Sequence, residues 1–555
     1  MRKLTVNRKT LSSDLTAGLT TALITIPDGL ASAILAGVNP VQGLYSLMFG
    51  TPVAALTTGS QFMYVSNTGA LAVAVGSVLA AYSQDEILLA LAVLTMLVGA
   101  FQLLLGLLRM GWIVRFVSHS VMVGFMTGIA LLIILGQLGS LTGYSSEYSN
   151  DLVALVDLVL NFNQVDLPTL TIGLITMVLI FLFGQTKLSK FSMILAMVGA
   201  SFLVTVFDLS SVQLIADIAD IPDSLPRPSL PDLSLVVGLI LPAISVAIIG
   251  LVQAAGVSKS VANPDGKFGD ISRDFSGQGL ANLSASLFQG LPIGGTMSET
   301  SVNISAGAKT RLANLLSGLM IIVIVLVFGD VVEKFAMPSI AALLIVAGYQ
   351  AIKKGQIADV WDTGMAPRLI MIFTFIATLF LPIQYAVFLG VALSVIQYWV
   401  SSSLDSRVVE LVPQDDGSWI ERPGPEKLID NRVTLLEPYG SLHYAAVYTL
   451  EDLLPSPETA RGAVVILRLR GREQISSTFI EVIERYAQQL QANGNKLVLS
   501  DVHAEVKNQI DRTETTDTIP EADIFLAAET RRGSTNAALA AAQAWVETNR
   551  SDEAQ

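Results

Sequence analysis

A segment rich in glycine and hydroxyl side chains interrupts an apolar stretch at residues 290–303. It reads Gly-Leu-Pro-Ile-Gly-Gly-Thr-Met-Ser-Glu-Thr-Ser-Val-Asn. Glycine and proline break helices, and non-helical backbone at membrane depth is tolerated only where it lines a cavity or is buried in protein. We expect a helix to begin again at Met297. The first turn of such a helix offers unpaired N–H groups and a partial positive charge, which suit an anion.

A second break of the same kind lies at residues 59–70, which read Gly-Ser-Gln-Phe-Met-Tyr-Val-Ser-Asn-Thr-Gly-Ala. The pattern predicts a short β-like stretch followed by a helix that begins near Thr68. Two short broken segments in matching halves of a membrane chain are the best sequence indication of a midplane binding site. We therefore expect two helix starts to face one substrate, with most contacts made by backbone amides.

Acidic side chains lie in or near these segments. Glu299 follows the expected helix start at Met297, and Asp28 follows Pro27 in the first apolar segment. Acids inside a membrane are costly to ionise and are functional candidates by default. Two plainer interpretations stay open: Glu299 only packs in a polar pocket, and Asp28 caps a helix break after Pro27.

The composition assigns much of the chain to a lipid environment. Of 555 residues, 52% are hydrophobic and 14% are charged, whereas soluble domains carry roughly 25% charged residues. Cysteine is absent, which excludes disulfides and thiolate metal sites, and a net charge of −13 argues against nucleic acid. We expect no metal centre, no cofactor and no enzymatic activity, because no P-loop or catalytic cluster is present.

Apolar blocks of about 20 residues can cross a bilayer. We expect about fourteen such segments, and the third, ninth and tenth are short or polar. They lie at 14–37, 41–59, 64–81, 87–108, 115–140, 168–185, 190–207, 233–256, 270–290, 296–308, 311–329, 338–352, 367–382 and 385–402.

The basic residues indicate the orientation of these segments. With the N-terminus inside, only Arg227 and Lys334 fall in outside loops among all Lys and Arg of residues 1–402. Lys and Arg favour the cytoplasm. We therefore expect a multi-pass protein of a bacterial plasma (inner) membrane with both termini cytoplasmic.

The segments fall into two halves, 14–207 and 233–402, joined by the proline-rich loop 221–231. An odd number of spans in each half would make the halves inverted repeats. We expect a transport domain over 1–402, a linker over 403–430 and a small soluble domain over 431–550.

The soluble domain alternates strand and helix patterns, which is typical of an α/β sandwich. We expect strands at 464–470, 496–500 and 524–527, and helices at 478–492, 504–510 and 534–549.

Several long motifs in order resemble the SulP (sulfate permease-like) anion transporters, the family that includes pendrin and prestin. They are Asp14-Leu-Thr-Ala-Gly-Leu19, Pro40-Val-Gln-Gly-Leu-Tyr-Ser46, residues 120–130, Gly277-Gln-Gly-Leu-Ala-Asn282 and residues 298–310. The resemblance implies a seven-plus-seven inverted repeat with two half-helices, a core domain facing a gate domain, a C-terminal STAS domain and a homodimer. Carried over position by position, it implies an anion site at Thr68, Gly69, Ala70, Gly295, Thr296, Met297 and Ser298.

Three positions depart from the family pattern and are our candidates for a coupling ion. Asp28 stands where many members have Gln, Gln253 where many have Glu, and Glu299 where many have Arg. A carboxylate beside an anion seat would repel the substrate unless it is protonated or paired with a cation. We therefore favour coupling to Na⁺ or H⁺, with a Na⁺ position near Glu299 as one option.

The expected function is secondary active transport of a small anion of the bicarbonate, sulfate or dicarboxylate class, by an elevator-like movement of the core. An uncoupled anion exchanger or channel is one alternative, and a non-transporting signalling or scaffold protein acting through the STAS domain is another. A nucleobase–cation symporter of the same fold is disfavoured by the C-terminal domain. The loop at 471–477 lacks the Asp-Ser pair of many STAS domains, so dimer contact or regulation is expected there instead of phospho-switching.

Overall fold

The structure is a computed structural model. It describes residues 8–148, 150–219, 221, 224–404, 406–414, 418–440, 442, 445–513, 515–530 and 532–552. The chain forms two compact units, residues 1–394 and residues 395–555.

Helices dominate the first unit, and each expected membrane segment contains one or more of them. They are α1 (Arg8–Leu35), α2 (Pro40–Tyr45), a π-helix (Ser46–Gly50), α3 (Thr51–Thr57), α4 (Gly69–Leu79), α5 (Ile87–Leu107), α6 (His119–Gly136), α7 (Leu138–Thr142), α8 (Asp151–Leu160), α9 (Leu167–Gly184), α10 (Ser192–Val206), α11 (Val236–Ser260), α12 (Ile271–Ser286), α13 (Met297–Ser305), α14 (Leu312–Glu333), α15 (Met337–Ala351), α16 (Lys354–Thr363), α17 (Met365–Phe380) and α18 (Ile383–Leu404). The sequence analysis did not anticipate α8 and α16, which connect membrane segments.

Within the described residues, six helices are long and apolar enough to cross a membrane by themselves, and four shorter apolar helices accompany them. The six lie at Thr10–Leu35, Ile87–Leu107, His119–Thr142, Leu167–Gly184, Leu233–Ser260 and Leu312–Glu333. Among the shorter ones is Gly69–Leu79, which follows the first expected break. A multi-pass helical membrane domain is therefore confirmed.

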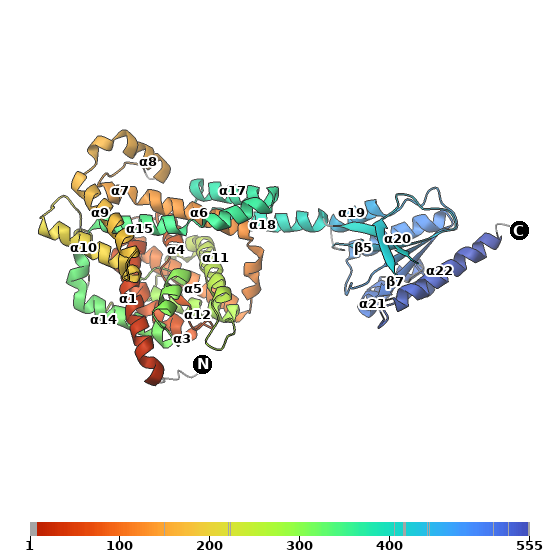
Figure 1. Ribbon diagram of the computed structural model, residues 1–555, viewed down its shortest axis with the longest axis horizontal. Helices are drawn as coiled ribbons and strands as arrows, with labels where there is room; N and C mark the ends of the chain where they lie inside the picture. Colours follow the sequence, from red (N-terminus) through yellow and green to blue (C-terminus); the bar gives the residue numbers. More distant parts are fainter. Residues whose placement is uncertain are drawn as a thin grey trace. The chain divides into compact units, whose positions relative to one another are not determined.

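The helices of this unit pack as two groups (Figure 1). The core group contains α1–α5 and α11–α14: α5 packs on α11 and α12, while α14 packs on α1 and α3. The gate group contains α6, α7, α9, α10, α15 and α17: α6 packs on α15 and α17, while α9 packs on α10 and α15. The start of α4 also contacts α6 of the gate group, so one expected site element lies where the groups meet.

Pro27 does not break the first helix. Helix α1 is continuous from Arg8 to Leu35 with Pro27 inside it. The interpretation of Asp28 as a cap for a helix break is therefore wrong, because the flanking apolar residues Ile26 and Leu30 are buried and hold the helix together across the proline.

The second unit is a six-stranded sheet with helices. Its strands are β3 (Arg407–Pro413), β4 (Trp419–Pro423), β5 (Val433–Tyr439), β6 (Val464–Arg468), β7 (Lys496–Val502) and β8 (Ile524–Leu526), in the order β4-β3-β5-β6-β7-β8. Its helices are α19 (Ala445–Leu453), α20 (Ser477–Ala492), α21 (Ala504–Arg512) and α22 (Gly533–Asp552). Strands β5 to β8 pair in parallel, whereas β3 and β4 pair antiparallel.

The expected strands and helices after residue 463 are all present, which confirms the α/β class. Strands β3 and β4, however, lie inside the 403–430 segment that the sequence analysis treated as a linker. The residues of β4, Trp-Ile-Glu-Arg-Pro, are mostly exposed and do not alternate, so their strand conformation comes from pairing with β3.

Candidate functional site

Two short strands bring the broken segments together. Strand β1 (Tyr64–Ser66) pairs antiparallel with β2 (Gly294–Thr296), with Tyr64 opposite Thr296 and Ser66 opposite Gly294. The strands come from opposite halves of the chain and are fully buried. Sequence positions more than two hundred residues apart are therefore held one strand spacing, about 4.8 Å, from each other.

A helix begins directly after each strand. Helix α4 begins at Gly69 after the cap residue Thr68, and α13 begins at Met297 after the cap residue Thr296. Because the strands are antiparallel, the helices leave from opposite ends of the pair. The two expected half-helices are present, and each follows one strand of a short pair that the sequence analysis did not predict.

The two caps differ. The Thr68 hydroxyl accepts a hydrogen bond from the Leu71 amide (3.1 Å), which satisfies one amide of the first turn of α4. Thr296 makes no such bond, and its hydroxyl instead donates to the Tyr64 carbonyl (3.4 Å). In this described segment the first-turn amides of α13 are therefore left to water or a ligand.

The predicted site residues at the start of α13 are also more exposed than those at the start of α4. Ala70, Gly295 and Thr296 are buried, while Thr68 and Gly69 are half-buried. Met297 is 42% exposed, and Ser298 is exposed too. The first turn of α13 thus faces open space, as a binding surface must.

The Gly294–Gly295 pair serves packing more than ligand approach. A Cβ atom on Gly295 would lie 2.8 Å from the Met63 sulfur and 3.0 Å from Ala254 Cα, and one on Gly294 would lie 3.1 Å from Leu71 Cδ1. Helix α11 and strand β2 are in contact, so the missing side chains let the strand lie against that helix.

Gln253 is joined to the first helix start. Its side-chain oxygen accepts a hydrogen bond from the Thr68 hydroxyl (3.2 Å). Thr68 therefore holds Gln253 with its hydroxyl proton while its oxygen caps α4. This contact gives α11 a direct link to the site.

The two acids lie near each other beside the second helix start. Glu299 is buried, and its carboxylate accepts a hydrogen bond from the Ser298 hydroxyl (2.6 Å). Asp28 of α1 is within electrostatic range of Glu299, and α1 contacts α13. The buried Tyr64 hydroxyl lies within range of both acids and is 2.7 Å from the Ser317 hydroxyl. Two carboxyl groups and several neutral oxygens therefore share one buried region.

Several positioning residues were not identified as site residues from the sequence. Thr300 accepts a hydrogen bond from the Tyr64 amide (2.9 Å), which ties α13 to β1. The Asn282 side chain bonds both the amide and the carbonyl of Ile293 (2.7 and 3.0 Å) and also Gln102 (2.8 Å). Asn282 of α12 therefore links α5 to the segment that leads into β2.

Two buried carboxylates fix the loops that border the broken segments. Asp274 accepts hydrogen bonds from the amides of Gly59 and Ser60 (both 2.8 Å) and from the Ser60 hydroxyl (2.6 Å). Asp14 does the same for Lys309 and Thr310, at 2.7 Å and 3.0 Å from their amides. Each carboxylate accepts hydrogen bonds from backbone amides of a loop that would otherwise lack partners.

Replacing Asp274 by alanine should therefore destabilise the core group. The fully buried carboxylate makes three hydrogen bonds, and their loss should cost about 3 kcal/mol or more. Thermal unfolding of the purified chain in detergent measures this. Asp270→Ala is the matched control: Asp270 caps the start of the same helix from an exposed position, and its loss should cost about 1 kcal/mol. Equal shifts for the two variants would contradict the assigned role.

The fold and the site together define a class: a multi-pass membrane transporter with two half-helices that start at a shared strand pair, joined to an α/β domain. Comparisons with known proteins identify the family within this class. The model of the sulfate permease family matches residues 11–374, and that of the STAS domain matches residues 424–530. The chain belongs to the sulfate permease family of anion transporters.

Similar proteins cover most of the chain. A probable sulfate transporter 4.2 of Arabidopsis thaliana is 25% identical over 520 residues, which is 89% of this chain and 76% of that protein. A putative sulfate transporter, YvdB, of Bacillus subtilis is 24% identical over 516 residues, covering 91% and 94%. The solved structure of SLC26A9 has the same fold, with a TM-score of 0.85 at 20% identity over 98% of this chain and 92% of that one.

Proposed function

We propose that this protein carries a small anion across a bacterial inner membrane by binding it at the starts of α4 and α13. The observation that carries the proposal is the β1–β2 pair, which joins the two segments that lead into these helix starts. The accessible first turn of α13, with Met297 at 42% exposure, supports the same site. Amides of Gly69, Ala70, Met297 and Ser298 would donate to the anion, and Thr68, Gly295 and Thr296 would shape the seat.

The anion is one of the class that includes sulfate, bicarbonate and dicarboxylates. Sulfate is favoured because two relatives that match nearly the whole chain are named sulfate transporters. A tetrahedral dianion also suits a site built from amide donors, because amides stabilise negative charge without adding a fixed cation.

Transport is coupled to Na⁺ or H⁺ through Asp28 and Glu299. Two neighbouring carboxyl groups, of which Glu299 is buried and Asp28 half-buried, are costly if both are ionised. A proton or a sodium ion held between them, with the Ser298 hydroxyl as a neighbouring oxygen, would remove this repulsion when the anion binds. Through its hydrogen bond with Thr68, Gln253 would couple the position of α11 to the anion site.

The core group moves as a unit against the gate group. The tight packing of α5 with α12 and of α1 with α14 and the tethers through Asp14 and Asp274 favour a rigid core that holds the site. We further propose a homodimer with both termini in the cytoplasm. The proposed domains are a transport domain over 1–402, a segment over 403–430 that also contributes β3 and β4 to the sheet, and a STAS domain over 431–550 with a regulatory or dimerising role.

Uptake into proteoliposomes tests the proposal. The purified full chain is reconstituted, and labelled sulfate, bicarbonate and oxalate are offered with and without an inward Na⁺ or pH gradient. We expect saturable uptake of at least one anion that rises with one of the gradients. Saturable uptake independent of both gradients would indicate an uncoupled exchanger or channel, and absence of flux for every anion would indicate a signalling or scaffold role.

A further inference from the structure

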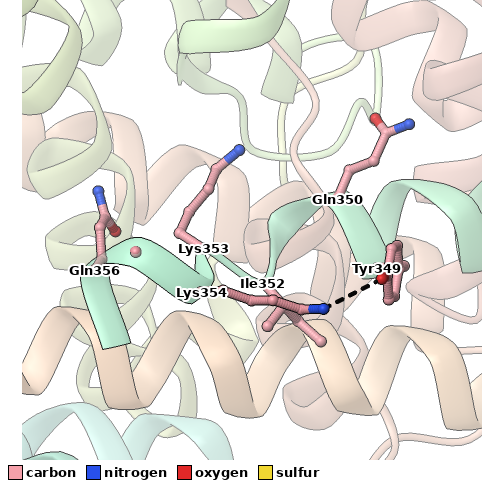
Figure 2. Close-up of a pocket in the computed structure, with 7 residues that line it drawn as sticks. Tyr349, Gln350, Ile352, Lys353, Lys354 and Gln356 are labelled. Atoms are coloured by element: carbon pink, nitrogen blue, oxygen red, sulfur yellow. Dashed lines mark hydrogen bonds between the residues drawn. The ribbon is translucent and has the colours of Figure 1, made fainter. Parts of the chain in front are cut away.

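A cavity of about 530 Å³ lies where α15 ends and α16 begins. It is lined by Tyr349, Gln350, Ile352, Lys353, Lys354, Gly355 and Gln356. Figure 2 shows Lys354 reaching toward Tyr349, whose hydroxyl lies 3.5 Å from the lysine nitrogen, while Lys353, Gln350 and Gln356 extend to one side of the loop. Two of these seven described lining residues are basic and none is acidic, so the cavity favours a negatively charged group.

The connection that forms this cavity belongs at the surface of the membrane. Helices α15 and α17 are apolar segments, and the ten residues of α16 join them. The connection lies on the side that carries most Lys and Arg residues of the transport domain. That side faces the cytoplasmic leaflet, where anionic lipids attract basic residues next to the bilayer.

One exposed aromatic side chain lines the cavity, and a second lies further along α16. Tyr349 is 60% exposed and Trp361 is 48% exposed. Tyrosine and tryptophan are enriched at the level of lipid headgroups, because each has an apolar ring with a polar edge. The Lys354 nitrogen lies 5.6 Å from the Tyr349 ring centre, and the Arg368 guanidinium lies 5.4 Å from that of Trp361.

Helix α16 is held in place on its opposite face. Val360 is almost fully buried and packs with Val123 of α6 and Met371 of α17, and Ile357 packs against them. This apolar contact fixes the start of α16, so Lys353 and Lys354 are presented at a defined place instead of on a loose loop. Binding of a ligand there therefore costs less conformational entropy, because the backbone that carries the two lysines is already ordered.

We propose that this cavity binds the headgroup of an anionic phospholipid of the surrounding bilayer. The lysines contact its phosphate, and Gln350 and Gln356 supply further hydrogen bonds. A lipid fits better than a free phosphate ion because the cavity lies in the connection between two apolar helices and is lined by the exposed ring of Tyr349, which a soluble ion does not need. The site belongs to the gate group, and the proposal does not depend on the anion seat at α4 and α13.

Lipid retention by the full chain tests this site. The purified protein is mixed with phosphatidylglycerol or phosphatidylcholine in detergent, and native mass spectrometry measures the lipid that stays bound. The test variant is Lys353→Gln with Lys354→Gln. The control variant, Lys187→Gln with Lys267→Gln, removes two charges from exposed positions on the same side of the membrane. All four positions are exposed, and each variant should unfold at the same temperature as the unmodified chain in phosphatidylcholine.

We expect the unmodified chain and the control variant to retain phosphatidylglycerol in preference to phosphatidylcholine. The test variant should bind phosphatidylglycerol about fivefold more weakly for each lysine removed. Equal retention of phosphatidylglycerol by the test and control variants would overturn the proposal. So would displacement of the bound lipid by millimolar inorganic phosphate, because the cavity would then be a site for soluble anions.

Discussion

Replacing Met297 by proline should weaken anion uptake at least tenfold without disrupting α13. Met297 is the first residue of this helix, a position that tolerates proline because its amide has no partner within the helix. Thr296 before it has φ −113° and ψ 135°, the extended conformation that a residue before proline requires. The substitution therefore removes one amide hydrogen and little else from the backbone.

The size of the effect follows from the chemistry of the missing bond. A hydrogen bond to a charged group contributes roughly 1.5–3 kcal/mol, which corresponds to a loss of about 10- to 150-fold in affinity. Met297→Ala is the matched control, because it shortens the side chain and keeps the amide. Concentration dependence of uptake in proteoliposomes separates the two variants. If alanine and proline lower the apparent affinity equally, the side chain and not the amide carries the interaction.

Replacing Glu299 by glutamine should make anion uptake insensitive to the coupling gradient. The exchange keeps the shape and the contact with Ser298 while it removes the negative charge that we assign to cation binding. Without that charge, the repulsion with Asp28 no longer needs a bound cation to relieve it. We expect uptake driven by a Na⁺ or pH gradient to fall about tenfold or more, toward the rate without a gradient, because the coupling cation loses a charged partner.

Two further variants sharpen this prediction. Asp28→Asn should produce the same loss of gradient dependence, since the two acids act on one cation. Glu86→Gln makes the same chemical change at an exposed position and should leave gradient dependence intact. Gradient-driven uptake that persists unchanged in both Asp28→Asn and Glu299→Gln would refute the coupling role of this pair.

The membrane segments could be predicted because long apolar runs have few other structures available to them. Helices α8 and α16 were missed because they are short and few of their apolar side chains are buried. Val153, Val156 and Val159 of α8 are exposed, and α16 has only two apolar residues that pack, Ile357 and Val360. Such short helices form through contacts with neighbouring segments and leave little periodic pattern in the sequence.

The two helix starts of the candidate site were predictable from their glycine, proline and threonine residues. The register of β1 and β2 was not, because three-residue strands have too little pattern to define a pairing. The packing of Gly295 also depends on Met63, which precedes β1, and on Ala254 of α11. A glycine signals a close approach, but only the fold shows which atoms make it.

In the C-terminal α/β domain, too, elements that depend on distant pairing partners could not be predicted. Strands β6 and β7 are buried apolar runs and were recognised, whereas β3 and β4 depend on the sheet edge they extend. In the loop before α20, Ser476 caps the helix through the Phe479 amide (3.2 Å) and donates to the Leu442 carbonyl (2.8 Å). Ser476 therefore fixes the start of α20, and the absence of phospho-switching at this loop stays a prediction.

Anomalous diffraction from crystals of the full chain soaked with selenate would locate the substrate most directly, since selenium marks a sulfate-like anion. We predict a peak at the ends of the β1–β2 pair, within hydrogen-bond reach of the first-turn amides of α4 and α13. A selenate peak elsewhere in the transport domain, with water alone at these helix starts, would contradict our account of how the anion is held.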